Sequence, residues 1–522
     1  MILFHVRQLF VIGHLSIQSL AAWSPMTFDV PLQDPFQAII TPSPQLTSHA
    51  LPVSNSTPSF WMAGAPGVNP LARVGSTGTL TADADICIIG SGITGVSVAY
   101  HLSKLFGDNV TLRDPLSVVI LEARDFCSGA TGRNGGHLTP HSFIGFKRDA
   151  AMWGIPDAIR AVHIEEHVVN AIVSLVKNAG LENEVDLVDS GRTILFLTGE
   201  EEEGARDDYE LAKAAGINVS VAEWLLKDEA EKRYGAQYPG VRTPGNTIWP
   251  LKLVTHLFKL AQNASSAVSL KLHTHTPVVA VRPLSGDARR WQLETPRGSV
   301  RCTHVVHATN AYASALLPQL SGRAGIVPTR GQVIAIRPAV PTRELTLSGF
   351  TADHGLEYWF MRPGSPPDER PLVILGGARL TEGSSRGATT DDSVLDAAVG
   401  RRLRNFLAEV FPGNFENGVE PEMEWTGIMG FTELGDPFVG PVLHKFEPGG
   451  LSYEGQYIAA GFSGHGMPRA FGCADVLARI IAFKITNQEW ELPPWFPLHY
   501  LTTREDSHRE MCNIHHLDVP HR

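Results

Sequence analysis

The chain has 522 residues, of which 43% are hydrophobic and 19% charged, and its formal net charge is −11. This is the composition of a folded globular protein long enough for about two or three domains. Because the chain is acidic and has no long basic run, we do not expect a nucleic-acid partner. Its five scattered cysteines contain no CxxC pair, so we predict neither a disulfide framework nor a metal site.

The N-terminal region leaves two interpretations open. Residues 1–22 contain one arginine and then a mostly apolar stretch, with Ser19 and Ala21 at the spacing of a signal-peptidase site. The stretch is too short and too polar for a transmembrane helix, so we expect no stable membrane insertion. A cleaved signal peptide would make the protein secreted or part of the secretory pathway, whereas a disordered leader would leave it cytoplasmic. Residues 23–80 are rich in Pro, Ser and Thr and indicate a linker or N-terminal extension, with apolar islands at 51–53 and 59–61 that would tie it to the folded body.

Residues 85–122 read as a strand, a glycine turn, a helix, a second strand and an acid. The turn is Gly90-Ser91-Gly92-Ile93-Thr94-Gly95, and the acid is Glu122. In such a turn the first glycine permits the tight bend, the second lets the backbone approach a pyrophosphate, and the third lets helix and strand pack closely. The helix N-terminus favours phosphate, and the acid accepts hydrogen bonds from a ribose hydroxyl. The stretch predicts a dinucleotide site; a βαβ unit without a nucleotide would show the same pattern.

Small residues dominate the segment that follows this acid. A segment of this kind brings the backbone close to a flat or charged ligand, although a flexible surface loop would have the same composition. The candidate cofactor contacts here are Ala123, Arg124, Ser128, Ala130, Thr131, Arg133, Asn134, Gly135 and Gly136.

The middle of the chain alternates between helical and strand patterns. Apolar spacing predicts helices over 154–179, 200–216, 251–264 and 394–411, and mostly antiparallel strands over 326–380. A short strand over 278–281 adds Val279 to the candidate cofactor contacts. An apolar strand from His304 ends in small polar residues, and these provide three more candidate contacts: Ala308, Thr309 and Asn310.

A second strand, glycine-rich turn and helix occur near the C-terminus. The strand covers 457–460 and the helix 470–482. A second helix N-terminus aimed at the ligand would stabilise negative charge on it. The turn between them supplies six further candidate contacts: Gly461, Ser463, Gly464, His465, Gly466 and Met467.

Taken together, these blocks resemble the FAD-dependent oxidoreductases of the D-amino-acid oxidase, glycine oxidase and sarcosine oxidase superfamily, with most likeness to the γ-glutamylputrescine-oxidase-like branch. The resemblance implies an α/β fold with a Rossmann-like FAD-binding domain built from discontinuous segments, and an α+β substrate domain with a large mixed or antiparallel sheet. It assigns residues 81–185, 245–325 and 420–485 to the FAD-binding domain, 186–244 and 326–419 to the substrate domain, and 486–522 to a C-terminal tail.

The resemblance also implies a chemistry. In the family a hydride equivalent passes from a carbon beside nitrogen to flavin N5, and oxygen is the expected acceptor. The implied substrate is a small-molecule amine or amino acid; the alternative is a tailoring enzyme that oxidises an alcohol or a ring C–N bond of a larger secondary metabolite. The chain has no cysteine near residues 428–429, where sarcosine oxidases link their flavin, so we expect non-covalent FAD.

Three residues are candidates for catalysis. Tyr358 and Arg362 resemble a Tyr-x-x-x-Arg segment in which the arginine grips the substrate carboxylate, although a surface ion pair would also explain that arginine. His465 would tune the flavin ring or assist proton transfer, unless only its backbone matters. The sequence does not indicate an oligomeric state.

Overall fold

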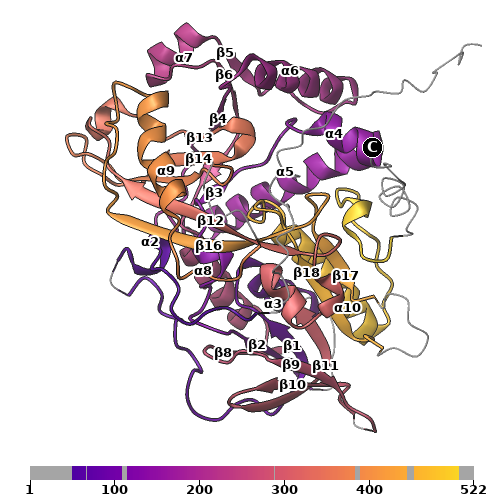
Figure 1. Cartoon of the computed structure of the whole chain (residues 1–522). Coiled ribbons are helices and arrows are strands. Elements are labelled where there is room, and N and C mark those ends of the chain that lie inside the picture. The colour runs from indigo at the N-terminus through magenta and orange to yellow at the C-terminus, as the bar shows by residue number, and fades with distance from the viewer. Residues whose placement is uncertain are drawn as a thin grey trace, which may run out of the picture. The chain divides into compact units, whose positions relative to one another are not determined.

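The computed structural model describes residues 50–65, 67–107, 114–286, 288–381, 388–443 and 452–504. The predicted signal segment at 1–22 lies outside these residues. Within them the chain forms two eight-stranded sheets and a two-stranded ribbon (Figure 1). No helix of this part of the chain is long and apolar enough to cross a membrane.

The first sheet has a parallel centre. Its strands run in the order β17-β18-β11-β1-β2-β8, and β18, β11, β1, β2 and β8 pair in parallel. In chain order this is the 3-2-1-4-5 arrangement of a doubly wound nucleotide-binding fold. Its strands are β1 (Asp83–Ile89), β2 (Leu116–Leu121), β8 (Val268–His273), β9 (Ala280–Pro283), β10 (Trp291–Thr295), β11 (Gly298–His307), β17 (Phe438–Pro441) and β18 (Gln456–Ala460).

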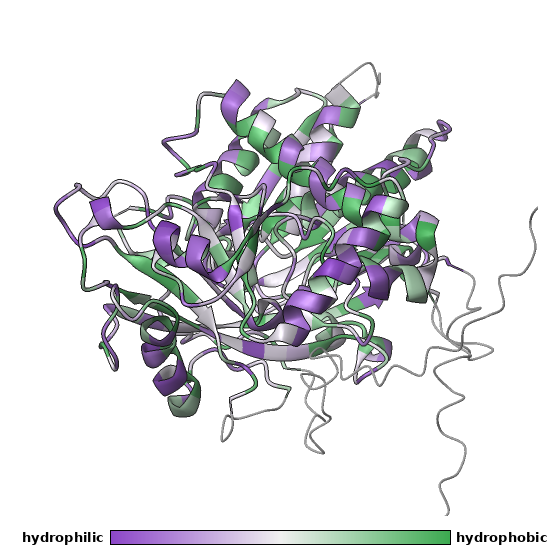
Figure 2. Ribbon diagram, turned by 90° about the horizontal axis from the view of Figure 1, so that it is seen from above, coloured by the Kyte–Doolittle hydropathy of each residue, from purple (hydrophilic) through white to green (hydrophobic). Residues whose placement is uncertain are grey.

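Both faces of the parallel strands are covered, which explains their continuous apolar runs. Successive side chains of a strand point to opposite faces. Ile86 and Ile88 of β1 therefore join the core under the helices, whereas Cys87 and Ile89 pack towards the antiparallel β9–β10 extension. The covering helices are α3 (Ile93–Gly107), α8 (Pro250–Asn263) and α10 (Ala470–Thr486). Figure 2 shows hydrophilic and hydrophobic residues alternating along many helices of the molecule, as expected for helices with one buried face.

The second sheet is antiparallel except where β13 pairs with β4, and its order is β16-β12-β15-β14-β13-β4-β6-β5. Trp359 packs under the helix α9, while its neighbour Phe360 joins the core of the first sheet, so this sheet has a helix on one face and the nucleotide-binding part on the other. Its strands are β4 (Arg192–Leu195), β5 (Glu223–Leu225), β6 (Gly240–Thr243), β12 (Val327–Ile336), β13 (Gly349–Ala352), β14 (Glu357–Met361), β15 (Val373–Gly377) and β16 (Met423–Phe431), and the helix α9 covers Ala397–Val410.

The remaining elements lie outside the two eight-stranded sheets. The ribbon pairs His137 with Thr247. The predicted helices over 154–179, 200–216, 251–264 and 394–411 are confirmed as α5, α6, α8 and α9. The two strands of the ribbon are β3 (His137–Leu138) and β7 (Asn246–Thr247), and the other α-helices are α2 (Phe60–Ala63), α4 (Phe146–Trp153), α5 (Ile155–Asn178), α6 (Gly199–Ala214) and α7 (Lys227–Tyr234).

The two terminal segments are part of the packed body where the structure describes them. In the predicted extension, Ser59 and Trp61 have no exposed surface. In the predicted tail, Phe496 is fully buried and Leu501 bridges to Val439 at the edge of the first sheet. The domain boundary predicted at residue 420 places β16 with the FAD-binding part, whereas its hydrogen bonds are to β12 of the second sheet. The domain division itself stays a prediction.

Candidate active site

The predicted cofactor residues gather at one edge of the first sheet. Gly90 follows β1, Ala308 follows β11 and Gly461 follows β18, at the carboxyl ends of three neighbouring parallel strands. The chain leaves β1 for β2 on one side and reaches β11 on the other, so the strand order reverses between β1 and β11. In doubly wound sheets ligands bind outside the carboxyl ends of the strands at this point.

The first glycine turn is packed so tightly that a side chain has no room at its first and last glycines. Gly90 has φ +106°, and a Cβ added to it would lie 2.7 Å from the carbonyl oxygen of Ala308. A Cβ on Gly95 would lie 2.0 Å from the carbonyl oxygen of Gly90. The turn therefore delivers the N-terminus of α3 to the sheet edge, and the amide of Ile93 donates to Thr131 Oγ1 at 3.1 Å.

Glu122, which follows β2, reaches back to the same turn. Its Oε2 accepts hydrogen bonds from the amide of Ser91 at 3.0 Å and from Ser91 Oγ at 2.7 Å. Its Oε1 accepts from the amide of Arg124 at 2.9 Å. The carboxylate is buried but anchored beside the glycine turn, which is where an acid for a ribose hydroxyl is needed.

The two predicted arginines of the following loop share a carboxylate that sequence reasoning missed. Asp392 has no exposed surface; Arg124 donates to it at 2.9 Å, and Arg133 lies 3.4 Å from it. Arg133 also donates to the carbonyl oxygens of Ser128 and Thr426. The two guanidinium groups thus fix the loop, and no local pattern around Asp392 predicts that it is their partner.

Several buried polar groups beside this loop have no partner among the described residues. They are Ser128 Oγ, Thr309 Oγ1 and Tyr312 OH. Burial raises the pKa of Tyr312, and the negative charge of Asp392 adds to that effect. A Cβ on Gly129 would meet open space. Unsatisfied buried hydroxyls and open backbone at the carboxyl edge of the sheet fit a large polar ligand such as FAD.

The second glycine turn is held by Asn310. Its Oδ1 accepts from the amides of Gly461 at 2.9 Å and Phe462 at 3.3 Å, which ties the segment after β11 to the segment after β18. Ser463 adopts φ +51° and donates its amide to Gly430 of β16. Met467 is buried in the core of the first sheet. Val279 is 46% exposed, and its amide donates to the carbonyl oxygen of Glu294 of β10. Its contact with the cofactor stays a prediction.

Arg362 is buried between an aspartate and three aromatic rings. Its guanidinium forms an ion pair with Asp186 and sits over the rings of Phe60, Trp61 and Trp249, at 5.5, 5.2 and 4.8 Å from their centroids. Only 6% of the residue is exposed. These contacts favour a structural role, since the charge of Arg362 is already compensated; carboxylate binding by it stays a prediction.

Tyr358 lies on the face of β14 that meets the nucleotide-binding part. Its ring packs so closely on the glycine loop that a Cβ on Gly135 would lie 2.4 Å from it. It also makes an edge contact with His137, at 5.8 Å between ring centroids. Burial raises the pKa of the Tyr358 phenol, so this hydroxyl remains protonated at neutral pH. Tyr358 thus adjoins the predicted cofactor loop.

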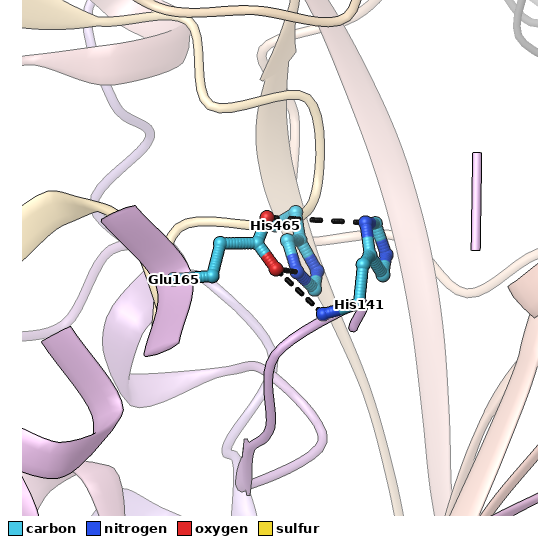
Figure 3. A group of neighbouring side chains, drawn as sticks. All are labelled: His141, Glu165 and His465. Carbon is cyan, nitrogen blue, oxygen red and sulfur yellow. Dashed lines mark hydrogen bonds and ion pairs between the residues drawn. The ribbon is translucent and has the colours of Figure 1, made fainter. Parts of the chain in front are cut away.

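His465 belongs to a polar cluster that Figure 3 shows, in which Glu165 is buried and the two histidine side chains are partly exposed. Its Nε2 lies 3.1 Å from Glu165 Oε2, and its ring stacks on that of His141 with centroids 3.6 Å apart. The backbone amide of His141 donates to the same oxygen of Glu165 at 2.6 Å. Glu165 comes from α5, His141 from the segment after β3 and His465 from the second glycine turn. The cluster therefore joins three distant parts of the chain.

Glu165 is kept ionised by its partners. Burial by itself would raise the pKa of this carboxyl, but its interaction with His465, which includes a hydrogen bond, and the positive charge of Arg469 outweigh that effect and hold the pKa well below its usual range. Arg469 Nε donates to Glu165 Oε1 at 2.7 Å. Two imidazoles and a carboxylate are also a set that can hold a metal ion, but the arginine already neutralises this carboxylate.

The histidines of the cluster are neutral at physiological pH. Burial lowers the pKa of His465, and Glu165 offsets only part of that effect. Burial also lowers the pKa of His141 well below its usual value, with the neighbouring His465 adding to it. Glu165 and His141 are site residues that the sequence did not reveal, since each is an isolated polar residue without a motif around it.

Comparison with known proteins agrees with this geometry. A family model described as FAD dependent oxidoreductase matches residues 85–480. The chain is 23% identical over 418 residues to the probable oxidoreductase OrdL of Rhizobium meliloti (strain 1021), covering 77% of this chain and 84% of that protein. It is 24% identical over 393 residues to the glycine oxidase of Geobacillus kaustophilus (strain HTA426), covering 73% and 89%.

The fold comparison gives the same result. The crystal structure of glycine oxidase from Geobacillus kaustophilus superposes with a TM-score of 0.58 at 21% sequence identity, covering 81% of this chain and all of the other. This likeness confirms the mixed α/β fold with its large sheets. Because the family model covers most of the chain and the sheet edge carries the expected turns, the chain belongs to the FAD-dependent oxidoreductase family and is an enzyme of the amine or amino-acid oxidase type.

Proposed function

We propose that this enzyme oxidises the C–N bond of an amine or amino acid, with oxygen as the final electron acceptor. The observation that carries the proposal is the placement of His465. This neutral imidazole, oriented by a buried carboxylate, lies in the second glycine turn at the same sheet edge as the predicted FAD contacts.

The residues that would hold FAD come from several loops at this edge. Glu122 would take the ribose, the turn from Gly90 to Gly95 and the N-terminus of α3 would take the pyrophosphate, and the loop 128–136 with the turn 461–467 would hold the ring. Bound FAD would supply the acceptor for the hydride leaving the carbon beside nitrogen. The four described cysteines are all buried, which supports the proposal that FAD is held without a covalent bond.

His465 has the features of a base for the substrate ammonium group. Amine oxidation requires the neutral amine, so one proton must leave the nitrogen first. With Nε2–H donated to Glu165, the acceptor nitrogen left on the ring is Nδ1, a tautomer assigned from the hydrogen-bond network. The carboxylate would stabilise the imidazolium once it forms, in the manner of a buried acid behind a catalytic histidine.

The visible spectrum of the purified protein tests the proposal. The spectrum would be recorded, then recorded again after a panel of amines and amino acids is added without oxygen, and the protein would finally be precipitated with acid. We expect a yellow protein that one class of amine bleaches and that releases its flavin into the acid supernatant. Colourless protein that cannot be reconstituted with FAD, or a flavin that no amine bleaches, would contradict the proposal.

A second candidate is oxidation of an alcohol or ring C–N bond in a larger metabolite. The ion pair between Arg362 and Asp186 favours it, because Arg362, the predicted carboxylate anchor directly after β14, already has a negative partner. Bleaching by bulky cyclic amines or alcohols, with no response to small amino acids, would select this candidate.

A further inference from the structure

Three potential metal ligands that the proposed reaction does not use lie together at a turn of the second sheet. Asp353 and His354 belong to η5 (Asp353–Gly355), the turn between β13 and β14, and Glu201 lies in the first turn of α6. One ligand atom from each side chain lies within 4.8 Å of the other two, and His354 Nε2 is 4.0 Å from Glu201 Oε1. The group joins segments that are 153 positions apart in the chain.

The carboxylate of Glu201 is held in place by backbone amides. Its Oε2 accepts from the amides of Leu197 at 2.6 Å and Thr198 at 3.0 Å, the second of which belongs to the capping box of α6. Its Oε1 accepts one hydrogen bond, from the amide of His354 at 2.8 Å. A carboxylate oxygen has two lone pairs, so Oε1 keeps one for a cation. The orientation of this ligand is therefore fixed before any ion binds.

A buried carboxyl beside the same turn has an oxygen without a partner. Glu357 begins β14 and pairs with Ala352 across the hairpin, so it lies at the base of the turn that carries Asp353. Only 4% of Glu357 is exposed; its Oε1 accepts from the amide of Ala378, whereas its Oε2 makes no hydrogen bond in the described part of the chain. Burial raises the pKa of this carboxyl to about 8, and the negative charge of Asp353 adds to the effect.

The cations near Glu357 leave its carboxyl uncompensated. The charges of Arg402 and Arg379 lower its pKa, but burial and Asp353 outweigh them. Arg402 forms its ion pair with Glu409, at 2.7 Å. Among the described residues, no arginine or lysine forms an ion pair with Asp353 or Glu357. A cation at the turn would relieve the repulsion between these two carboxyls, because it would attract both of them.

We propose that Glu201, Asp353 and His354 bind a divalent metal ion of the zinc type. One imidazole nitrogen and two carboxylate oxygens are ligands that zinc accepts, and water would complete a tetrahedral site. The 4.0 Å between His354 Nε2 and Glu201 Oε1 is close to twice a zinc–ligand distance of about 2.0–2.2 Å. A small rotation of the half-exposed His354 ring would therefore bring both atoms onto one ion.

The ion would join α6 to the turn between β13 and β14, and Glu357 would add negative charge at the base of that turn. The cysteine pattern of the chain predicted no metal site. This set contains no cysteine and combines a helix with a distant turn, so no local motif could indicate it.

The competing account is a solvated surface turn. Glu201 would then only cap α6 and hold the amide of His354, while Asp353 and the His354 ring would interact with water. Both accounts keep the same backbone hydrogen bonds, so they differ in whether a metal ion binds. Metal binding is measured without turnover, and its result is therefore independent of the proposed oxidation of an amine.

The test uses the FAD-loaded full chain, treated with a chelator and then titrated with zinc chloride in a calorimeter. The variants are Asp353→Asn and His354→Asn. Asparagine tolerates the positive φ of +49° and +54° at these positions, so a loss of binding would not come from backbone strain. We expect the parent to bind zinc, and each variant to bind it at least roughly 10-fold more weakly, because even an outer-shell partner of a metal contributes that much.

Two control variants separate this site from other places on the chain. Glu203→Gln removes an exposed acid of α6, and His465→Gln removes an imidazole from the Glu165 cluster, the other group of potential ligands. Both should bind zinc as the parent does. Zinc should also raise the melting temperature of the parent and of both controls, because it binds the folded state, but not that of Asp353→Asn or His354→Asn.

Three results would overturn the inference. The first is a parent protein that binds no zinc. The second is equal zinc affinity in the parent and in Asp353→Asn and His354→Asn, with melting curves recorded without metal to show that the variants fold. The third is loss of binding in His465→Gln alone, which would place the ion at the Glu165 cluster instead.

Discussion

Glu165 is the residue on which the cluster depends. Its carboxylate is hydrogen-bonded to three groups: the His465 ring, the backbone amide of His141 and the Arg469 guanidinium. Because its partners include both an imidazole and a guanidinium, the carboxylate stays ionised and can orient the histidine over the whole physiological pH range. A buried carboxylate that fixes a ring and its tautomer is a recurring support for catalytic histidines.

Glu165→Gln should therefore shift the pH dependence of the reaction. Activity should rise with pH as His465 loses its proton, and the charge of Glu165 raises the pKa of His465 against the effect of burial. Without that charge the pKa of His465 falls further, so the acid limb of kcat/KM should move to lower pH by about one pH unit. The rate on the plateau should fall by roughly 10- to 100-fold, because the ring loses its orienting partner.

A matched control is available on the same helix. Glu166 is the next residue on α5 and points to a different face, so Glu166→Gln should keep the pH profile of the parent enzyme. Melting curves would confirm that both variants fold. An acid limb that stays in place or moves to higher pH in Glu165→Gln would contradict the role given to this carboxylate.

The sequence predicted those candidate site residues that belong to a motif of neighbouring positions. The glycine turn, Glu122 and the second turn each carry a motif within a few positions, and all three lie at the sheet edge. Glu165 gave no such signal, because its partners come from remote segments: Glu165 meets His465 across 300 positions. An isolated glutamate on a helix is ordinary in any sequence.

At the scale of elements, the helix α2, which precedes the first strand, packs against the predicted cofactor loop. Trp61 of α2 has no exposed surface, and its Nε1 donates to the carbonyl of Asn134 at 2.5 Å. A Cβ on Gly136 would lie 2.9 Å from the Trp61 ring, so the glycine is needed for this contact. The segment thus covers the predicted cofactor loop. Its apolar island was recognisable in the sequence, but its position against Asn134 and Gly136 was not.

Other elements were missed for a reason that their composition explains. The helix α7 is mostly charged, and only Ala230 and Tyr234 are buried, so it has almost no apolar periodicity. The strand β13 lies within the predicted strand-rich stretch 326–380, but its parallel pairing with the remote β4 has no signal in the local sequence. Long amphipathic helices such as α5 were predicted well because packing and periodicity agree in them.

Trp61→Ala tests the element as a whole. Loss of a fully buried tryptophan should cost about 3–5 kcal/mol of unfolding free energy. The cofactor loop should also lose its cover, so FAD should dissociate more readily, as measured by flavin fluorescence in the flow-through of a gel-filtration step. Val74→Ala, at a residue that is 39% exposed, should change stability by less than about 0.5 kcal/mol. Parent-like melting and FAD retention in Trp61→Ala would show that the segment is dispensable.

At the scale of the whole molecule, His499 links the segment after α10 to two remote parts of the chain by charge. His499 Nδ1 lies 2.5 Å from Asp157 of α5, and its Nε2 lies 3.4 Å from Asp436 in the turn between β16 and β17. Asp436 in turn lies 3.5 Å from Arg469, which holds Glu165. His499 and the Glu165 cluster are therefore connected through a chain of buried charged residues.

This connection predicts a pH-dependent stability. Burial by itself would lower the pKa of His499, but Asp436 and Asp157 outweigh it and raise the pKa above the ordinary 6.5. A group whose pKa is raised by folding stabilises the fold fully below its unfolded pKa and loses that contribution as the pH rises through the folded pKa. The melting temperature gap between the parent and His499→Gln should therefore be larger at pH 6 than at pH 9. His163→Gln, at an exposed position of α5, should show no gap at either pH. A gap for His499→Gln that grows with pH would mean that the two aspartates do not hold a charged imidazole, and the chain of charges from the C-terminal segment to Glu165 would then lack its first link.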